Sequence, residues 1–245
     1  MQAQRTRKTI NVLTQTYPDL SEAQAYDIQS ATLLIRTARH VGFKLGYTSA
    51  AMRQQMNIDQ PNYGTLTDDM RLDPGDPLVK SAELIHPLVE PEIALLVGRQ
   101  IEGVGHDRAS IWQHVDAVMP AIEIVDTRYH EYKFAQADNI SDNSSSARFL
   151  TGTPRQCAGI DEARRVAVEL RADGCAIDHG VGANALEDPI LALLWLAHFF
   201  GRRGHAIAEG SIVLTGGLTR AYPVRQGQSI EAEFGELGTV SMRFV

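Results

Sequence analysis

The chain has 245 residues, and its 23 lysines and arginines against 30 aspartates and glutamates give a formal net charge of −7. Its 44% hydrophobic and 22% charged residues are typical of a globular protein and exclude a disordered or collagen-like chain. The acidic balance argues against nucleic acid or an anionic membrane surface as the main partner, and no apolar stretch is long enough to span a bilayer.

The first half of the chain is expected to start with helices and to continue into strands. Ser21 and Gln24 have the spacing of a capping box, which indicates a helix start. The expected elements are helices within residues 1–40, a tight strand edge or turn at 41–46, a loop at 59–63, a strand at 89–97, a helix through Ile111, Val115 and Val118 that ends at Pro120, and a strand at 121–125.

The second half is expected to place short strands around one helix. Asp173-Gly174 indicates a hairpin turn, and Asp188-Pro189 combines a helix N-cap with a proline at the first helical position. The expected elements are a loop at 138–146, hairpin strands at 165–171 and 175–179, a helix from Asp188 towards Gly201 or Gly204, and strands at 211–215, 229–234 and 239–245. This pattern favours an α+β protein whose mixed or antiparallel sheet curls, rather than a βαβ repeat.

Several common kinds of site are absent from the sequence. Cys157 and Cys175 are too few for a Cys-rich zinc site or a disulfide framework, so we expect free thiols in a cytoplasmic protein. No G-x-G-x-x-G, Walker, H-E-x-x-H or G-x-S-x-G motif occurs, which removes the common nucleotide, zincin and hydrolase interpretations.

Three glutamates lie in strands that are otherwise apolar. Glu90 and Glu92 are two residues apart, so in a strand they point to the same face, about 6–7 Å apart along the chain. Glu123 lies between Ile122 and Ile124, where a buried charge is costly without a partner. Ligands that offer only oxygen suit a hard ion such as Mg²⁺ or Mn²⁺. On spacing alone, a metal site and salt bridges to arginines are equally supported.

Other polar residues have both a structural and a functional interpretation. Lys44 interrupts an apolar segment flanked by glycines; its ammonium group could reach solvent or, if buried, could act as an acid, a base or an anion-binding group. Arg148 could bind a carboxylate through two hydrogen bonds. The backbone of Thr215-Gly216-Gly217 could approach a ligand closely. Each feature taken alone is more often structural.

In this order the motifs resemble the hydratase/decarboxylase family of the fumarylacetoacetate-hydrolase-like superfamily. The resemblance extends from about residue 20 to the C-terminus, and it is specific as an ordered set although each motif is weak alone. The motifs are Lys44-Leu45-Gly46-Tyr47-Thr48, Asp59-Gln60-Pro61, Gly64-Thr65-Leu66, Asp68-Asp69-Met70, Glu90-Pro91-Glu92-Ile93-Ala94, Pro120-Ala121-Ile122-Glu123, Asp142-Asn143-Ser144 and Thr215-Gly216-Gly217-Leu218-Thr219.

The resemblance implies a fold, a cofactor and a set of site residues. The fold would be a curled mixed β-sheet or barrel core at residues 76–245 with a helical and α/β portion at residues 1–75, in one compact unit. It implies a homo-oligomer, Mg²⁺ (or Mn²⁺) as the metal, and a small anionic 2-oxo acid as the substrate. The implied site residues are Lys44 as the active-site lysine, Glu90, Glu92 and Glu123 as metal ligands, and Asn62, Asp69, Ser144, Arg148, Thr215 and Gly216 near the substrate.

Two branches of the family differ in the activity that they imply. Hydratases carry an aspartate directly after the proline of the D-Q-P loop, whereas this chain has Asn62, and an amide is no general acid or base near neutral pH. The segments 126–129, 132–134 and 145–149 resemble the decarboxylase branch, and Arg128, Lys133 and Arg148 add cations suited to a second substrate carboxylate.

The resemblance therefore implies decarboxylation of 2-oxohex-3-enedioate to 2-hydroxypenta-2,4-dienoate and CO₂ in the meta-cleavage breakdown of aromatic compounds. Two alternatives remain open. One is a hydratase of the same family, and the other is a non-catalytic partner that stabilises a pathway hydratase in a mixed complex. The intact Lys44 and the three glutamates count against the non-catalytic role.

Overall fold

The computed structural model describes residues 2–49, 53–54, 58, 60–156 and 159–245. Its centre is a seven-stranded mixed sheet with the strand order β2-β1-β11-β4-β6-β7, in which β12 also pairs with β4. Strands β1 and β11 are parallel, and the other pairs of this sheet are antiparallel. The strands are β1 (His40–Gly46), β2 (Asn62–Thr67), β4 (Leu88–Val97), β6 (Val115–Val125), β7 (Ser146–Thr151), β11 (Ile212–Leu214) and β12 (Tyr222–Pro223).

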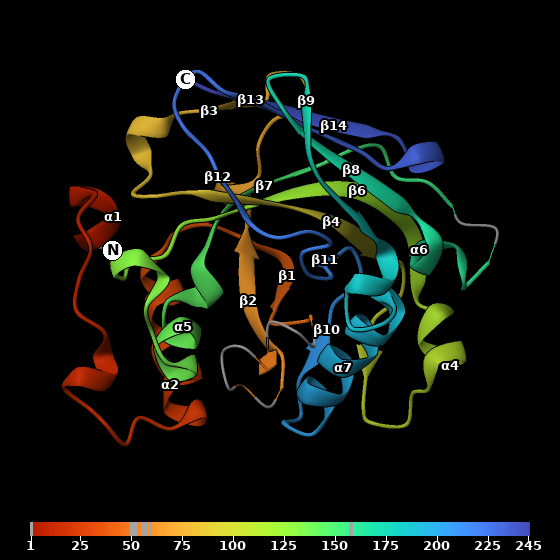
Figure 1. The fold of residues 1–245 in the computed structure, drawn as a ribbon. Coiled ribbons are helices and arrows are strands. Elements are labelled where there is room, and N and C mark those ends of the chain that lie inside the picture. Colours follow the sequence, from red (N-terminus) through yellow and green to blue (C-terminus); the bar gives the residue numbers. More distant parts are fainter. Residues whose placement is uncertain (1, 50–52, 55–57, 59, 157–158) are drawn as a thin grey trace.

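A second sheet and several helices cover the central sheet. The five-stranded sheet has the order β3-β14-β13-β8-β9 and lies across the top of Figure 1, over β4 and β6. Helices α2 and α5 flank β1 and β2 on one side, and α7 and α4 lie on the other (Figure 1). The remaining elements are β3 (Leu78–Val79), β5 (Ile101–Glu102), β8 (Ala167–Ala172), β9 (Cys175–Val181), β10 (Ala206–Ile207), β13 (Ser229–Glu233), β14 (Thr239–Phe244), α1 (Gln2–Thr6), α2 (Glu22–Ile35), α4 (Arg108–Trp112), α5 (Gln136–Ser141), α6 (Glu162–Arg165) and α7 (Pro189–Gly201).

The two faces of the central sheet have different environments. Alternate residues of β4 and β6, among them Ile93 and Ile122, join the main core, which also includes residues of the second sheet and of α7. The opposite face carries a smaller apolar cluster that includes Ala94, Met119 and Leu214. Because side chains alternate along a strand, Glu90 and Glu92 lie on the same face as Ala94, at one end of that cluster.

Most of the predicted elements are confirmed. Ser21 and Gln24 form a capping box at the start of α2. Asp188 caps α7 by accepting a hydrogen bond from the Ile190 N–H, and Pro189 is its first residue. The strand at 89–97, the hairpin around Asp173-Gly174 and the three C-terminal strands are also present. The α+β class with a curled mixed sheet is therefore confirmed.

The predicted helix through Ile111 and Val118 is wrong. Helix α4 ends at Trp112, and Val118 and Pro120 lie in β6. Both faces of β6 are buried, so its apolar residues follow no period-two pattern that would distinguish it from a helix. Proline has no N–H to donate to a neighbouring strand. The ring nitrogen of Pro120 points towards the chain just after Thr151, the last residue of β7, so the sheet loses little hydrogen bonding there.

Three other predictions need correction or stay open. Residues 41–46 are neither an edge nor a turn, because β1 lies between β2 and β11. The expected loop at 138–146 contains most of α5 and a 3₁₀ turn at Asn143–Ser145. The expected loop at 59–63 includes the start of β2, while Asp59 lies outside the described residues.

The division at residue 75 stays a prediction. Strands β1 and β2 precede that point, yet they belong to the same sheet as β4, β6 and β11. Cys175 is a free, exposed thiol, and Cys157 lies outside the described residues. Among the described residues, none of the helices has the length and apolar character needed to cross a membrane.

Candidate active site

Three carboxylates and one lysine meet on the face of the central sheet that carries the smaller cluster. Glu90 lies directly opposite Glu123 in the β4–β6 register, and Glu92 is two residues further along β4. One carboxylate oxygen from each of the three glutamates lies within 4.8 Å of the others. Lys44 reaches this group from β1 and is 3% exposed. We call these four residues the charged cluster.

The ammonium group of Lys44 is held in place by two contacts. Its Nζ atom lies 3.0 Å from Glu123 Oε2 and donates a hydrogen bond to the Ser144 carbonyl oxygen at 3.1 Å. Burial opposes the charged form, but the carboxylates of Glu123, Glu90 and Glu92 outweigh it and raise the pKa of Lys44 above its ordinary value. Lys44 is therefore a fixed cation and hydrogen-bond donor near neutral pH.

Burial disfavours the charged form of all three glutamates. Burial, together with the neighbouring Glu123 charge, raises the pKa of Glu92 well above its ordinary value. Burial raises the pKa of Glu90 to about 7, although Lys44 acts in the opposite direction. Burial also raises the pKa of Glu123 against the attraction of Lys44. One lysine therefore does not provide enough positive charge for three carboxylates of which two, Glu92 and Glu123, are fully buried.

The carboxylate oxygens fit a divalent metal ion. Glu92 Oε2 accepts a hydrogen bond of 2.7 Å from the Gly216 N–H, while Glu92 Oε1 is buried and has no hydrogen-bond donor among the described residues. Glu123 Oε2 is also buried and has the Lys44 ammonium group 3.0 Å away. Three carboxylates and one ammonium leave two negative charges, which a doubly charged ion would balance. A site made only of oxygen atoms suits Mg²⁺ or Mn²⁺.

A chain of hydrogen bonds continues from Lys44 into the protein. The Ser144 hydroxyl donates to Asn62 Oδ1 at 2.9 Å, and its oxygen lies 3.5 Å from Lys44 Nζ. Asn62 Nδ2 donates to Asn139 Oδ1 at 2.8 Å, and Asn139 Nδ2 donates to Ser145 Oγ at 3.0 Å. The amide of Asn62 therefore has a partner on both sides, which fixes its orientation beside the charged cluster.

Ser144 belongs to a turn with unusual backbone angles. Asn143, Ser144 and Ser145 have φ values of 54°, 51° and 60°, in the left-handed region that residues other than glycine rarely occupy. The Asn143 side chain holds this turn against β2, because its Oδ1 accepts from the Thr65 N–H at 2.8 Å and its Nδ2 donates to the Thr65 carbonyl at 2.9 Å. This conformation directs the Ser144 carbonyl towards Lys44.

Arg128 supports the same turn from behind. It forms a buried ion pair with Asp142 and donates to the carbonyl oxygens of Asp126 at 2.9 Å and Ser146 at 3.1 Å. The Thr127 hydroxyl adds a 2.9 Å hydrogen bond to Asp142. The donors of Arg128 are thus used within the protein, which contradicts its interpretation as a cation available to the substrate.

Two of the predicted substrate-binding residues lie away from the charged cluster. Arg148 is paired in register with Ile124, so it projects from the face opposite Glu123, and it forms a 3.0 Å salt bridge with Glu83. Asp69 forms an ion pair with Arg36 and accepts a 2.6 Å hydrogen bond from the Thr67 hydroxyl. Lys133, the third expected cation, is exposed and pairs with Glu131 at 2.6 Å.

The structure brings the other predicted residues to the charged cluster. Ser144 contacts Lys44, Asn62 is connected to the cluster through Ser144, and Gly216 donates to Glu92. Thr215 uses its hydroxyl in a 2.8 Å hydrogen bond to the Ile93 carbonyl. Gly216 has a φ of 109°, and a Cβ atom there would lie 1.9 Å from Thr48 Oγ1, so a side chain is excluded at this position.

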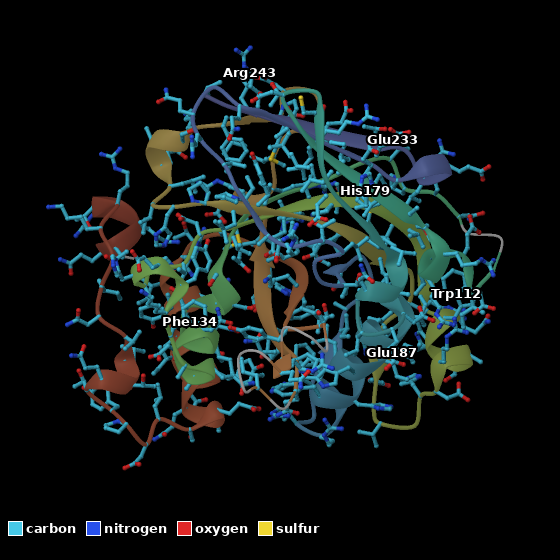
Figure 2. The ribbon with its side chains drawn as sticks, in the orientation of Figure 1. Trp112, Phe134, His179, Glu187, Glu233 and Arg243 are labelled. Atoms are coloured by element: carbon cyan, nitrogen blue, oxygen red, sulfur yellow. The ribbon has the colours of Figure 1, made fainter. Side chains whose placement is uncertain are left out.

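A cavity of about 830 Å³ lies next to Gly217 and is not lined by the charged cluster itself. Gly217 and Thr48 line it, and a Cβ atom on Gly217 would lie 3.1 Å from Glu90 Oε1. His179 on β9 and Glu187 before α7 also line it, and both are labelled in Figure 2. This volume is sufficient for a small organic acid, and Gly217 lies between the cavity and Glu90.

A curled mixed sheet that presents buried carboxylates and a lysine beside a cavity defines an enzyme of the fumarylacetoacetate-hydrolase-like class. Residues 38–245 match the family model described as "Fumarylacetoacetate (FAA) hydrolase C-terminal". The chain belongs to the 4-oxalocrotonate decarboxylase and 2-keto-4-pentenoate hydratase family of this superfamily. It is a lyase of that family, whose decarboxylases and hydratases act in the meta-cleavage catabolism of aromatic compounds.

Individual relatives support both branches. The chain is 35% identical over 236 residues to a 4-oxalocrotonate decarboxylase of Pseudomonas sp. (strain CF600), and the matched region covers 95% of this chain and 89% of the relative. It is 34% identical over 248 residues to a 2-keto-4-pentenoate hydratase of Paraburkholderia xenovorans (strain LB400), and the matched region covers 99% of this chain and 91% of the relative. The solved structure of 4-oxalocrotonate decarboxylase from Pseudomonas putida G7, complexed with magnesium and adipate, superposes with a TM-score of 0.92 at 33% identity and covers 100% of this chain and 94% of that one.

Proposed function

We propose that the chain is a magnesium-dependent decarboxylase that converts 2-oxohex-3-enedioate (4-oxalocrotonate) into 2-hydroxypenta-2,4-dienoate and CO₂. The observation that carries the proposal is Asn62, which is connected to Lys44 through Ser144 and occupies the position where the family resemblance places an aspartate in hydratases. Its amide is bound on one side by Ser144 and on the other by Asn139. A neutral amide held in this way cannot exchange a proton with water near neutral pH.

The charged cluster supplies the electrostatics that the reaction needs. Glu90, Glu92 and Glu123 would hold Mg²⁺, with Mn²⁺ as an alternative, and the bound ion supplies Lewis-acid stabilisation of negative charge on oxygen. Lys44 contributes a fixed ammonium group whose position is set by Glu123 and by the Ser144 carbonyl. A preorganised cation of this kind stabilises charge as it develops, without having to reorient during the reaction.

The proposed electron flow ends at the C2 oxygen of the substrate. As the C5–C6 bond breaks, its electron pair forms the C4–C5 double bond, the C3–C4 pair moves to C2–C3, and the C2 carbonyl pair becomes negative charge on oxygen. C6 leaves as CO₂. Lys44 donates a hydrogen bond, and then a proton, to the C2 oxygen to give the enol product. Ser144 Oγ lies 3.5 Å from Lys44 Nζ, where its lone pair can keep the ammonium group aligned.

The proposal is tested by measuring two products from one preparation. Purified protein with Mg²⁺ should consume 2-oxohex-3-enedioate, followed by ultraviolet absorbance, and should release one equivalent of CO₂. Glu92→Gln should lose the Mg²⁺-dependent turnover, whereas Glu83→Gln, which changes an exposed carboxylate away from the cluster, should retain it. Efficient hydration of 2-hydroxypenta-2,4-dienoate without CO₂ release would overturn the decarboxylase assignment.

Hydration is the second candidate function. The similarity to the Paraburkholderia xenovorans hydratase favours it, since that relative is 34% identical over 99% of this chain. Water addition would require a group other than Asn62 to exchange the proton. The CO₂ measurement separates the two activities directly.

We further propose that the chain forms a homo-oligomer and can associate with a pathway hydratase. Leu34 and Ile35 at the end of α2 are 87% and 65% exposed, and adjacent exposed apolar side chains are typical of association surfaces. A purely non-catalytic role in such a complex is disfavoured, because Lys44 and the three glutamates converge on one point. Light scattering of the purified protein, alone and mixed with a hydratase, tests both associations.

A further inference from the structure

Arg53 differs from the other shielded arginines of the chain. Six arginines in the described part are buried or half-buried: Arg36, Arg53, Arg108, Arg128, Arg148 and Arg171. Five of them form an ion pair with a described aspartate or glutamate, and Arg53 is the exception. A guanidinium group that is partly removed from water and has no carboxylate partner is a ready binding site for an anion.

The position of the Arg53 guanidinium group is fixed by the backbone of the segment after β1. Its Nη1 atom donates to the carbonyl oxygens of Tyr47 at 2.7 Å and Thr48 at 2.9 Å. These two hydrogen bonds use one of the terminal nitrogens. The planar group carries five N–H donors, and Nε and Nη2 donate to none of the residues that the structure describes, so they are left to bind a carboxylate through two parallel hydrogen bonds.

Arg53 lies on the cavity next to Gly217. It lines the same 830 Å³ space as Thr48 and Gly217. Thr48 contacts Gly216, whose N–H donates to Glu92, and Gly217 lies against Glu90. A continuous row of contacts therefore leads from two of the three carboxylates to the guanidinium group of Arg53.

The second arginine of this cavity is less suited to the same role. Arg220 also lines the space, but its side chain is 87% exposed and its Nε atom forms a 3.1 Å ion pair with Asp178. An exposed and already paired guanidinium group contributes little to binding. Arg53 is half-buried and has no carboxylate partner in the described part of the chain, so it is the better partner for an anion.

We propose that Arg53 binds the substrate carboxylate remote from the metal, and thereby makes the site selective for dicarboxylates. The inference rests on the proposed function and identifies the cation that faces the C6 carboxylate. Because that carboxylate leaves as neutral CO₂, Arg53 interacts with the substrate and not with the product. Arg53 should therefore affect KM more than kcat.

The test compares a dicarboxylate with a monocarboxylate of the same length. Isothermal titration calorimetry of the full chain with Mg²⁺ should show tighter binding of adipate than of hexanoate. Arg53→Gln can still donate to the Tyr47 and Thr48 carbonyls but lacks the charge. It should weaken adipate binding about 10- to 100-fold, the range expected for a lost charge-assisted pair, and should change hexanoate binding less than about twofold.

Two further variants make the result specific. Arg53→Lys keeps the charge without the planar fork, so it should recover part of the adipate affinity. Arg225→Met removes an equal charge from an exposed side chain outside the cavity and should leave both affinities unchanged. Equal binding of adipate and hexanoate by the wild type, or unchanged adipate binding by Arg53→Gln, overturns the inference. If adipate binding depends on Arg53 but no CO₂ is released from 2-oxohex-3-enedioate, the proposed function fails and the carboxylate site stands.

Discussion

Asn143 should determine both the stability and the activity of the protein through the left-handed turn that carries Ser144. Replacing Asn143 by alanine puts a residue that disfavours this region at a φ of 54°, which costs about 1–2 kcal/mol. It also removes the two hydrogen bonds to the Thr65 backbone, each with a net contribution of about 0.5–1.5 kcal/mol. The expected loss in the free energy of unfolding is about 2–5 kcal/mol, the sum of these contributions.

A glycine at position 143 separates these two contributions. Asn143→Gly accepts the left-handed conformation but lacks the side-chain hydrogen bonds, so it should lose only about 1–3 kcal/mol. Urea denaturation at constant pH, without and with Mg²⁺, measures both variants. Both should lower kcat, because the Ser144 carbonyl no longer holds Lys44 firmly, while Mg²⁺ affinity changes little. Equal stability of the two variants would refute the backbone argument, and wild-type kcat in Asn143→Gly would refute the role of the hydrogen bonds to Thr65.

Three further predictions concern charge. Arg128→Met should destabilise the protein by about 3–5 kcal/mol because it leaves Asp142 buried without its cation, and adding Asp142→Asn should recover part of that loss, as a double-mutant cycle would measure. The Glu90 carboxyl has a raised pKa of about 7, so the folded metal-free protein binds more protons than the unfolded chain between pH 4.5 and 7. The melting temperature of the metal-free protein should therefore fall as the pH rises through this window, and Mg²⁺ should oppose the fall. If the melting temperature of the metal-free protein instead rises through the window, burial is not the cause of the raised pKa of Glu90. Arg148→Met removes a partly exposed salt bridge with Glu83, so KM should stay within about twofold of the wild-type value and the free energy of unfolding within about 1 kcal/mol. A large rise in KM would show that Arg148 binds the substrate after all.

The sequence predicted the charged cluster because its members follow local rules. Glu90 and Glu92 are two residues apart in one strand, and Glu123 interrupts an apolar strand, so each stands out from its own neighbours. Spacing alone did not distinguish a metal site from salt bridges. The tertiary structure adds the reason to favour a metal, since it supplies only Lys44 as a nearby cation and leaves Glu92 Oε1 without a donor among the described residues.

Features that depend on register or on distant contacts could not be read from the sequence. Arg148 follows three serines, a context that favours a substrate-binding residue, but the β6–β7 register pairs it with Ile124 and places it on the face opposite Glu123. The contact of Asn139 with Asn62 joins segments 77 residues apart. Nothing in the sequence distinguishes Arg53, because its distinguishing property is the lack of a described carboxylate partner, which only the packed structure reveals.

The central claim is that Glu90, Glu92 and Glu123 together bind one divalent ion. Anomalous diffraction at the manganese edge from crystals soaked in Mn²⁺ tests it most directly. A single strong peak between the three carboxylates, lost in Glu92→Gln crystals, is the predicted result. A difference map with no peak there, or with manganese bound only elsewhere on the chain, would contradict it.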